Sequence, residues 1–209
     1  MNGGHSDALR TLRMGAGISI VEGIAGLVAV ALAIIGLANV APWVLASVAA
    51  IALGAAFVFE SGAMAARFSA LESEAQEESV SWLKWSTAGA EFLMGFAGIA
   101  LGILALLGID PAALVPVAII VYGTALMVDS GIRMRLRKLE TKHLDWRSFA
   151  FAAPQVFVGL GSITLSILAL VGVAPLDLIL VGLLSVGTAV LITGSLVTGR
   201  SISLYRRSE

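Results

Sequence analysis

Four carboxylic acids stand within long apolar stretches of this sequence, and they are the residues best placed to do chemistry. They are Glu22, Glu60, Glu91 and Asp129. The interiors of the same stretches contain no Lys or Arg that could neutralise them. An ionised acid at the centre of a bilayer costs roughly 2.5–3.5 kcal/mol on insertion scales. Acids in such positions therefore either bind protons or cations or form structural pairs.

The composition places these stretches in a membrane. Of the 209 residues, 58% are hydrophobic and only 13% are charged, and the mean hydropathy is +0.98. Soluble domains carry about 45–50% apolar and about 25% charged residues, so this chain has more apolar surface than a water-facing globule can cover. The 23 glycines agree, because glycine is commoner in membrane helices than in soluble ones.

Other chemistry has little support in the sequence. The chain has no cysteine, which excludes disulfides and thiolate metal ligands. Its two histidines, His5 and His143, lie in polar flanks, and this argues against a haem or a His-based metal centre in the membrane. We therefore expect a non-enzymatic protein with no catalytic residue, cofactor or metal. Its surroundings are expected to be the lipid bilayer, with no nucleic-acid partner.

Six apolar stretches are long enough to cross the membrane as helices. Each can span the roughly 30 Å hydrocarbon layer at about 1.5 Å per residue. Their bounds are 14–38, 42–66, 82–108, 111–132, 149–172 and 175–199. Short links join them in pairs, and in the second and third pairs a Gly followed by a Pro stops one helix and starts the next. The sequence predicts one all-α membrane domain over residues 1–209, made of six transmembrane helices in three antiparallel hairpins.

The thirteen Lys and Arg residues all fall on one side of this arrangement. They flank the termini and the two long connections, whereas the three short turns carry none. By the positive-inside rule, both termini and both connections lie in the cytoplasm. Residues 71–78 hold four glutamates and residues 133–147 are basic, so these connections are expected to be solvated loops or helix extensions. The alternative is that they pair with each other, or that the basic one binds anionic lipid.

The three hairpins are copies of one unit. Aligned on Pro42, Pro111 and Pro175, they match without gaps as repeats 14–67, 82–136 and 149–200. Glycines recur sixteen residues before and twelve residues after these turn prolines, at Gly26, Gly95, Gly159 and at Gly54, Gly123, Gly187. Small residues let helix backbones approach closely in lipid, so we interpret these glycines as helix-packing residues. Three equivalent hairpins imply a bundle with a pseudo-threefold axis.

The repeat also brings the polar residues to one depth. Twenty residues before the prolines lie Glu22, Glu91 and Gln155, and eighteen residues after them lie Glu60, Asp129 and Thr193. Both positions are about 24–27 Å below the outer surface, in the cytoplasmic third of the bilayer. One interpretation is structural, with the acids paired to interfacial Arg residues such as Arg133 or to nearby serines (Ser19, Ser61, Ser130). The alternative is a ring of six groups that lines a cytoplasm-facing vestibule and binds protons or a cation.

The order of these features is similar to that of a known family. Each hairpin has a Gly-rich apolar helix, a proline at the outer turn and a second apolar helix with a central glycine; the clearest copy is GFAGIALGILALLGIDP followed by VYGTALMVDSGIRMRL. Three such hairpins in about 200 residues resemble the HdeD family of small bacterial inner-membrane proteins. The resemblance covers nearly the whole chain. It implies a multi-pass protein of the bacterial inner membrane associated with acid resistance, and it supplies no catalytic motif.

Three functional hypotheses remain open at this point. The first is a non-enzymatic HdeD-like protein that acts in envelope or acid-stress physiology, as a closed bundle without a continuous polar path. The second is a small proton- or cation-translocating protein that uses the carboxylate ring. The third is an accessory subunit, or a homo-oligomer, that packs through its Gly-rich helix faces against other membrane chains. The apolar outer halves of the spans argue against an open channel.

Overall fold

The protein is a bundle of long helices. A computed structural model describes the backbone of residues 21, 23–72, 78–141 and 146–205, and the side chains of residues 21, 23–62, 89–131 and 153–193. Its helices are α2 (Pro42–Glu72), α3 (Glu78–Leu106), α4 (Pro111–Thr141), α5 (Trp146–Leu170) and α6 (Pro175–Tyr205). A further helix over Gly23–Leu37 precedes them. All regular structure within these described residues is helical, which confirms the all-α prediction.

Five of the helices are long and apolar enough to cross a membrane, and this supports an integral membrane protein. Their apolar windows are Pro42–Gly62, Gly89–Leu106, Pro111–Gly131, Ala153–Leu170 and Pro175–Thr193. The described part of the first expected span, Gly23–Leu37, is shorter than a membrane crossing requires. Residues 14–20 and Glu22 of that span lie outside the described residues.

Two helices extend past the apolar stretches expected from sequence, at the ends that lie away from the short turns. Helix α2 continues to Glu72 and α4 to Thr141, although their apolar runs end near residues 66 and 132. The basic connection, residues 133–147, is thus helical over 133–141 and 146–147, whereas only residues 71, 72 and 78 of the acidic connection are described. Residues 73–77 and 142–145 within them lie outside the described part of the chain.

The three short turns share one backbone conformation. The residue three positions before each proline has a positive φ: 64° at Asn39, 84° at Gly108 and 92° at Gly172. The residue just before each proline does as well: 41° at Ala41, 38° at Asp110 and 38° at Ala174. Glycine adopts such angles readily, and Asn is the next most tolerant residue, which accounts for the choice at the first of these positions.

Hydrogen bonds at these turns explain where the helices stop and start. At the end of α3, the Gly108 amide donates to Ala105 O and the Ile109 amide to Leu104 O, a pattern that satisfies the last free carbonyls of a helix. The end of α5 repeats this pattern. Helix α4 then begins at Pro111, whose missing N–H costs nothing in a first turn, and Asp110 Oδ1 accepts from the Ala113 amide at 3.3 Å.

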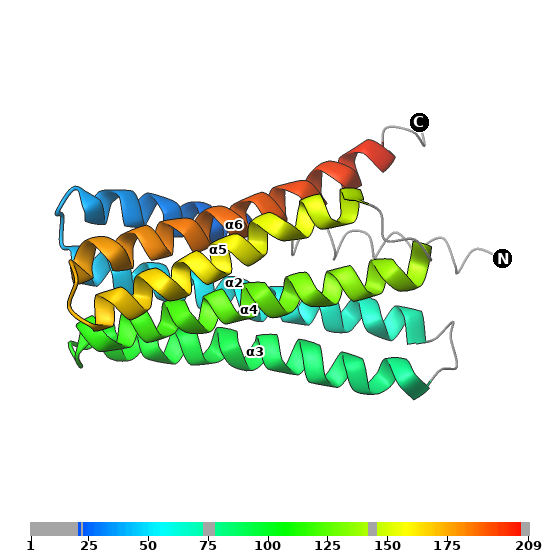
Figure 1. Ribbon diagram of the computed structural model, residues 1–209, viewed down its shortest axis with the longest axis horizontal. Coiled ribbons are helices and arrows are strands. Elements are labelled where there is room, and N and C mark those ends of the chain that lie inside the picture. Colours follow the sequence, from blue (N-terminus) through cyan, green and yellow to red (C-terminus); the bar gives the residue numbers. More distant parts are fainter. Residues whose placement is uncertain (1–20, 22, 73–77, 142–145, 206–209) are drawn as a thin grey trace.

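Helices α2, α4 and α6 form the centre of the bundle. All three begin at the turns gathered at one end and run in the same direction (Figure 1). Each of them contacts the other two, whereas α3 contacts only α2 and α4, and α5 only α4 and α6, among the helices α2 to α6. Burial agrees, since 44% of each apolar window is buried in the central helices, against 28% in α3 and 22% in α5.

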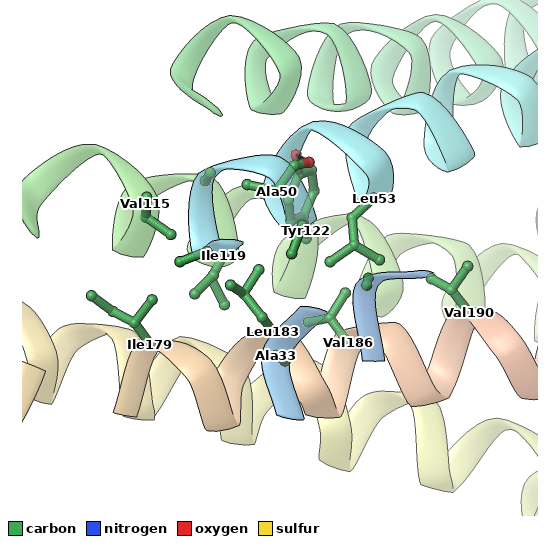
Figure 2. Packing of buried hydrophobic residues seen from close by; sticks show 14 of the residues in the cluster. Ala33, Ala50, Leu53, Val115, Ile119, Tyr122, Ile179, Leu183, Val186 and Val190 are labelled. Carbon is green, nitrogen blue, oxygen red and sulfur yellow. Dashed lines mark hydrogen bonds between the residues drawn. The ribbon is translucent and has the colours of Figure 1, made fainter. Parts of the chain in front are cut away.

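The core consists of layers contributed by these three helices (Figure 2). Four, eight, eleven and fifteen residues after the proline of each helix, every side chain is at most 3% exposed. The four layers are Ala46, Val115, Ile179; Ala50, Ile119, Leu183; Leu53, Tyr122, Val186; and Phe57, Leu126, Val190. Alternating steps of three and four residues keep one face of a helix toward its neighbours, as in a coiled coil. The middle of the bundle is thus filled by apolar side chains.

Glycine pairs join neighbouring helices at their closest points. The pairs are Gly54 with Gly95, Gly123 with Gly159, and Gly26 with Gly187. A Cβ placed on Gly54 would lie 2.7 Å from the carbonyl oxygen of Gly95, and one on Gly95 would lie 2.8 Å from that of Gly54. No side chain fits at such distances, so the backbones touch directly. Each pair joins the second helix of one expected hairpin to the first helix of another.

Candidate functional site

Three of the four sequence-predicted acids are described, and all three are buried. Glu60 on α2 is 9% exposed, Glu91 on α3 is 1% exposed and Asp129 on α4 is 3% exposed. Glu22 lies outside the described residues. Each of the three makes an interaction with another part of the protein. Acids are almost never fully buried without a partner or a bound proton, so their placement inside a lipid-embedded bundle is costly and specific.

The core face of the central helices explains why two of the acids are buried. Glu60, Asp129 and Thr193 stand eighteen residues after their prolines, three residues beyond the last apolar layer. The alternating steps of three and four residues therefore continue through them. Because α2, α4 and α6 contact one another, these residues lie on the faces that the three helices turn inward. A polar level, formed by Glu60, Asp129 and Thr193, follows the apolar layers at the end of the core away from the turns.

Thr193, the residue that α6 contributes to the polar level, shows how α5 and α6 contact each other. Gln155 on α5 donates through Nε2 to Thr193 Oγ1 on α6 at 3.0 Å. Thr193 Oγ1 in turn donates to Ala189 O at 3.0 Å, one turn back along α6. The two positions that the sequence places at one depth are thus in direct contact here. Neither residue carries a charge, so this pair is satisfied without a proton or an ion.

The serines next to the acids use their hydroxyl protons elsewhere. Ser61 Oγ donates to Val58 O and Ser130 Oγ donates to Met127 O, each at 2.8 Å. A hydroxyl has one proton, so neither serine can also donate to an ionised carboxylate. Both can still accept a hydrogen bond from a protonated acid. Ser19 and Arg133, the other partners suggested by the sequence, lie outside the described side chains.

Tyr122 of α4 is a polar core residue whose contacts the sequence did not indicate. Its ring is fully buried and stacks on Phe57 with centroids 5.3 Å apart. Its hydroxyl donates to Ala50 O of α2 across the core. The ring fits because Gly98 on α3 leaves its place free; a Cβ there would overlap the Tyr122 hydroxyl. The sequence did contain an indication of this contact. The repeat that has the large Tyr122 also has a glycine, Gly98, at the position where the other two repeats have Ala29 and Ser162.

No metal site is formed by the described residues, where no group of three His, Asp or Glu side chains comes together. Pro42, Pro111 and Pro175 each begin a central helix at the turn end of the bundle. The polar level is at the other end of the core, separated from the turns by the four apolar layers.

Comparison with known proteins finds no match. No family model, no curated protein and no solved structure matches the chain.

Proposed function

We propose that the protein is a non-enzymatic integral membrane protein that binds protons at buried carboxyl groups near its cytoplasmic side. The observation that carries the proposal is the burial of Glu60, Glu91 and Asp129, at most 9% exposed, at the inner end of an apolar core. Buried carboxyl groups shed their charge by taking a proton, and protonation is the least demanding way to keep three acids in one membrane level. A role in acid or envelope stress, as in HdeD-like proteins, fits this chemistry.

The layered core favours proton binding over transport. Four successive layers of apolar side chains, each at most 3% exposed, fill the centre of α2, α4 and α6 on the outer side of the acids. Ions and protons cross a membrane along polar groups or water, and these layers supply neither. The cation-translocating alternative would need a polar path around them. We therefore propose a closed bundle that responds to protons from the cytoplasm.

We further propose that the bundle consists of six spans in three repeated hairpins around a pseudo-threefold axis. Three features support this: the common turn conformation, the mutual contacts of α2, α4 and α6, and the cyclic order of the glycine pairs. Each pair joins a residue twelve positions after one proline to a residue sixteen positions before another. An arrangement of this kind follows naturally when three copies of one hairpin close into a ring.

The proposed location is the bacterial inner membrane, with both termini in the cytoplasm. The one-sided placement of all thirteen Lys and Arg residues supports this orientation. The accessory-subunit hypothesis gains less support, because the six repeated glycines already form contacts within the chain. A partner would have to use other faces of α3 and α5, where large apolar side chains such as Phe96 and Phe157 are exposed to lipid.

Two measurements on one pair of proteins test this function. The variant is neutralised at every acid of the level: Glu22→Gln, Glu60→Gln, Glu91→Gln and Asp129→Asn. In liposomes, wild type and variant are both expected to leak protons and cations no faster than protein-free vesicles. In thermal unfolding, the midpoint of the wild type is expected to vary more strongly with pH, since groups that bind protons differently in the folded and unfolded states create that dependence.

The outcomes separate the hypotheses. Proton or cation flux through the wild type that the variant loses would replace the closed bundle with the transport hypothesis. Equal pH dependence of unfolding in the two proteins, together with equal flux, would show that the acids bind no protons in this range and serve only as structural pairs.

A further inference from the structure

Two buried hydroxyl groups on α5 lack a hydrogen bond. Ser162 and Ser166 lie one helical turn apart and are fully buried. In the described part of the protein, neither Ser162 Oγ nor Ser166 Oγ has a hydrogen-bond partner. A buried hydroxyl left without a partner costs on the order of 1–3 kcal/mol. Two such groups on the same face of one helix call for a physical explanation.

The other hydroxyl groups in the bundle show that the missing bonds are not forced by the helix. Every other described Ser or Thr side chain donates to a carbonyl three or four residues back on its own helix: Ser47, Ser61, Thr124, Ser130, Thr164, Ser185, Thr188 and Thr193. The same bond is open to any helical serine. In the described part of the protein, Ser162 and Ser166 make no such bond.

The space that Ser166 faces belongs to a glycine of α6. A Cβ on Gly182 would lie 3.9 Å from Ser166 Oγ, and 3.4 and 3.5 Å from two methyl carbons of Ile119. These are near-ordinary contact distances, so a group about the size of a methyl fits there. The glycine pairs differ sharply, because a Cβ on Gly54 or Gly123 would meet a carbonyl oxygen at 2.7 Å. Gly182 therefore leaves room rather than bringing backbones together.

Equivalent positions in the other two repeats carry no such combination. Seven residues after their prolines, α2 and α4 have Ala49 and Ala118, both fully buried, where α6 has Gly182. Nine residues before the prolines stand Ala33 and Gly102, where α5 has Ser166. The contact between α5 and α6, called the seam below, therefore lacks a methyl group on the α6 side. On the α5 side it carries a hydroxyl group that the other two repeats do not have.

We propose that the seam between α5 and α6 binds a water molecule held by the hydroxyl groups of Ser162 and Ser166 beside Gly182. Residues one turn apart are separated by about 6 Å along the helix, which a single water can bridge with two hydrogen bonds of about 2.8 Å. A buried water needs a polar pocket of roughly its own size and two to four partners. Two neutral hydroxyls do not compensate the dehydration of an ion, so the ligand is a neutral molecule.

This site is independent of the proposed proton binding. It lies on the outer side of the Gln155–Thr193 hydrogen bond, in the same seam, since Ser162 is seven residues further along α5. The third pair of helices would then have polar contacts at two depths. In the second pair the Tyr122 ring occupies the corresponding space against Gly98.

A mutant cycle between Gly182 and the two serines tests the site. In the Ser162→Ala, Ser166→Ala background, where neither hydroxyl remains to need the water, Gly182→Ala is expected to raise the unfolding midpoint in detergent by about 2–4 °C, because alanine favours a helix and fills space. In the wild type the same methyl would displace the water, so no rise is expected. Equal rises in the two backgrounds would overturn the proposal. Gly161→Ala, at a position with nothing within 4 Å, measures the effect of helix propensity alone.

A second measurement uses the unmodified protein and does not depend on how the variants fold. In bilayers, solid-state NMR can follow magnetisation transfer from water to individual backbone sites. Ser162 and Ser166 are expected to receive it faster than Ala29 and Ala33, the buried residues at the same positions of the first repeat. Transfer that is no faster at the serines than at these alanines would show that the seam is dry and would refute the water site.

Discussion

The α3–α4 pair and the α5–α6 pair have the same turn geometry but carry different side chains at corresponding positions. In the first, Glu91 and Asp129 are buried acids; in the second, the same positions hold Gln155 and Thr193, joined by a hydrogen bond. The arrangement of the helices therefore does not require acidic side chains at this depth. The neutral pair is satisfied by its own hydrogen bond, and the proposed proton binding is therefore assigned to the acidic positions.

The two pairs also differ in how they fill the contact between their helices nearer the turns. In α3–α4, the Tyr122 ring lies over Gly98 and its hydroxyl reaches Ala50 O. In α5–α6, Ser162 and Val186 occupy those positions. The α3–α4 contact is filled by an aromatic ring whose hydroxyl is hydrogen-bonded. The α5–α6 contact holds two hydroxyl groups that have no partner among the described residues. Substitutions at four places test this difference between the two pairs of helices.

The largest effect is expected where the two pairs join. Gly159→Val places side-chain atoms where a Cβ would already lie 2.6 Å from Gly123 O, so the helices must separate. We expect a loss of about 4 kcal/mol or more, or failure to fold, measured by thermal unfolding in detergent. The control is Gly161→Val, two residues along the same helix at an open position. Similar losses in the two variants would contradict the close contact.

The next largest effect is expected when the side chains between α3 and α4 are replaced by those at the corresponding positions of α5 and α6. Gly98→Ser alone forces a side chain against the Tyr122 ring and is expected to cost about 3 kcal/mol of unfolding free energy. Adding Tyr122→Val, the residue of α6, removes the ring and should recover part of the loss. Chemical or thermal unfolding of the four proteins in this cycle gives the coupling. Additive losses would show that the two positions are not in contact.

A smaller effect is expected from converting the acids. Glu91→Gln with Asp129→Thr gives α3–α4 the neutral pair of α5–α6. Replacing buried acids by groups that satisfy one another is often neutral or stabilising, so we expect a change within about 2 kcal/mol at neutral pH. The dependence of the unfolding midpoint on pH should weaken at the same time. A large loss of stability at all pH values would mean that the acids hold structural partners together.

The smallest effect is expected at the neutral pair itself. Gln155→Leu and Thr193→Val each remove one side of the hydrogen bond between α5 and α6. Hydrogen bonds between membrane helices average about 0.6 kcal/mol in double-mutant cycles, so a coupling of that order is expected. The two single variants and the double variant, unfolded in the same detergent, supply the cycle. A coupling indistinguishable from zero would show that this hydrogen bond does not contribute to stability.

The sequence predicted where the helices begin better than it predicted which helices contact one another. Proline positions located the starts of α2, α4 and α6, because a proline is favoured in the first turn of a helix. Glycine spacing indicated that helix backbones approach each other closely, but it did not identify which helices do so. Gly54 contacts Gly95 of the following hairpin and not a residue of its own hairpin. Spacing defines a helix face, whereas the choice of neighbouring helix depends on how all the faces close together.

The candidate site was only partly accessible to sequence reasoning. Counting from the prolines placed Gln155 and Thr193 at one depth, and they are in contact. The unpartnered hydroxyls of Ser162 and Ser166 depend on side-chain rotamers and on the room left by Gly182, which residue types alone do not determine. For Glu22 the depth remains a prediction, because that residue lies outside the described part of the chain.

Infrared spectroscopy of the protein in bilayers tests the central claim most directly. The C=O band of protonated carboxylic acids is followed as the pH is lowered, in the wild type and in the variant Glu91→Gln with Asp129→Thr. The account predicts that the wild type gains a band component that the variant lacks, because the buried acids of α3–α4 take up protons. Identical titrations of the two proteins would contradict it.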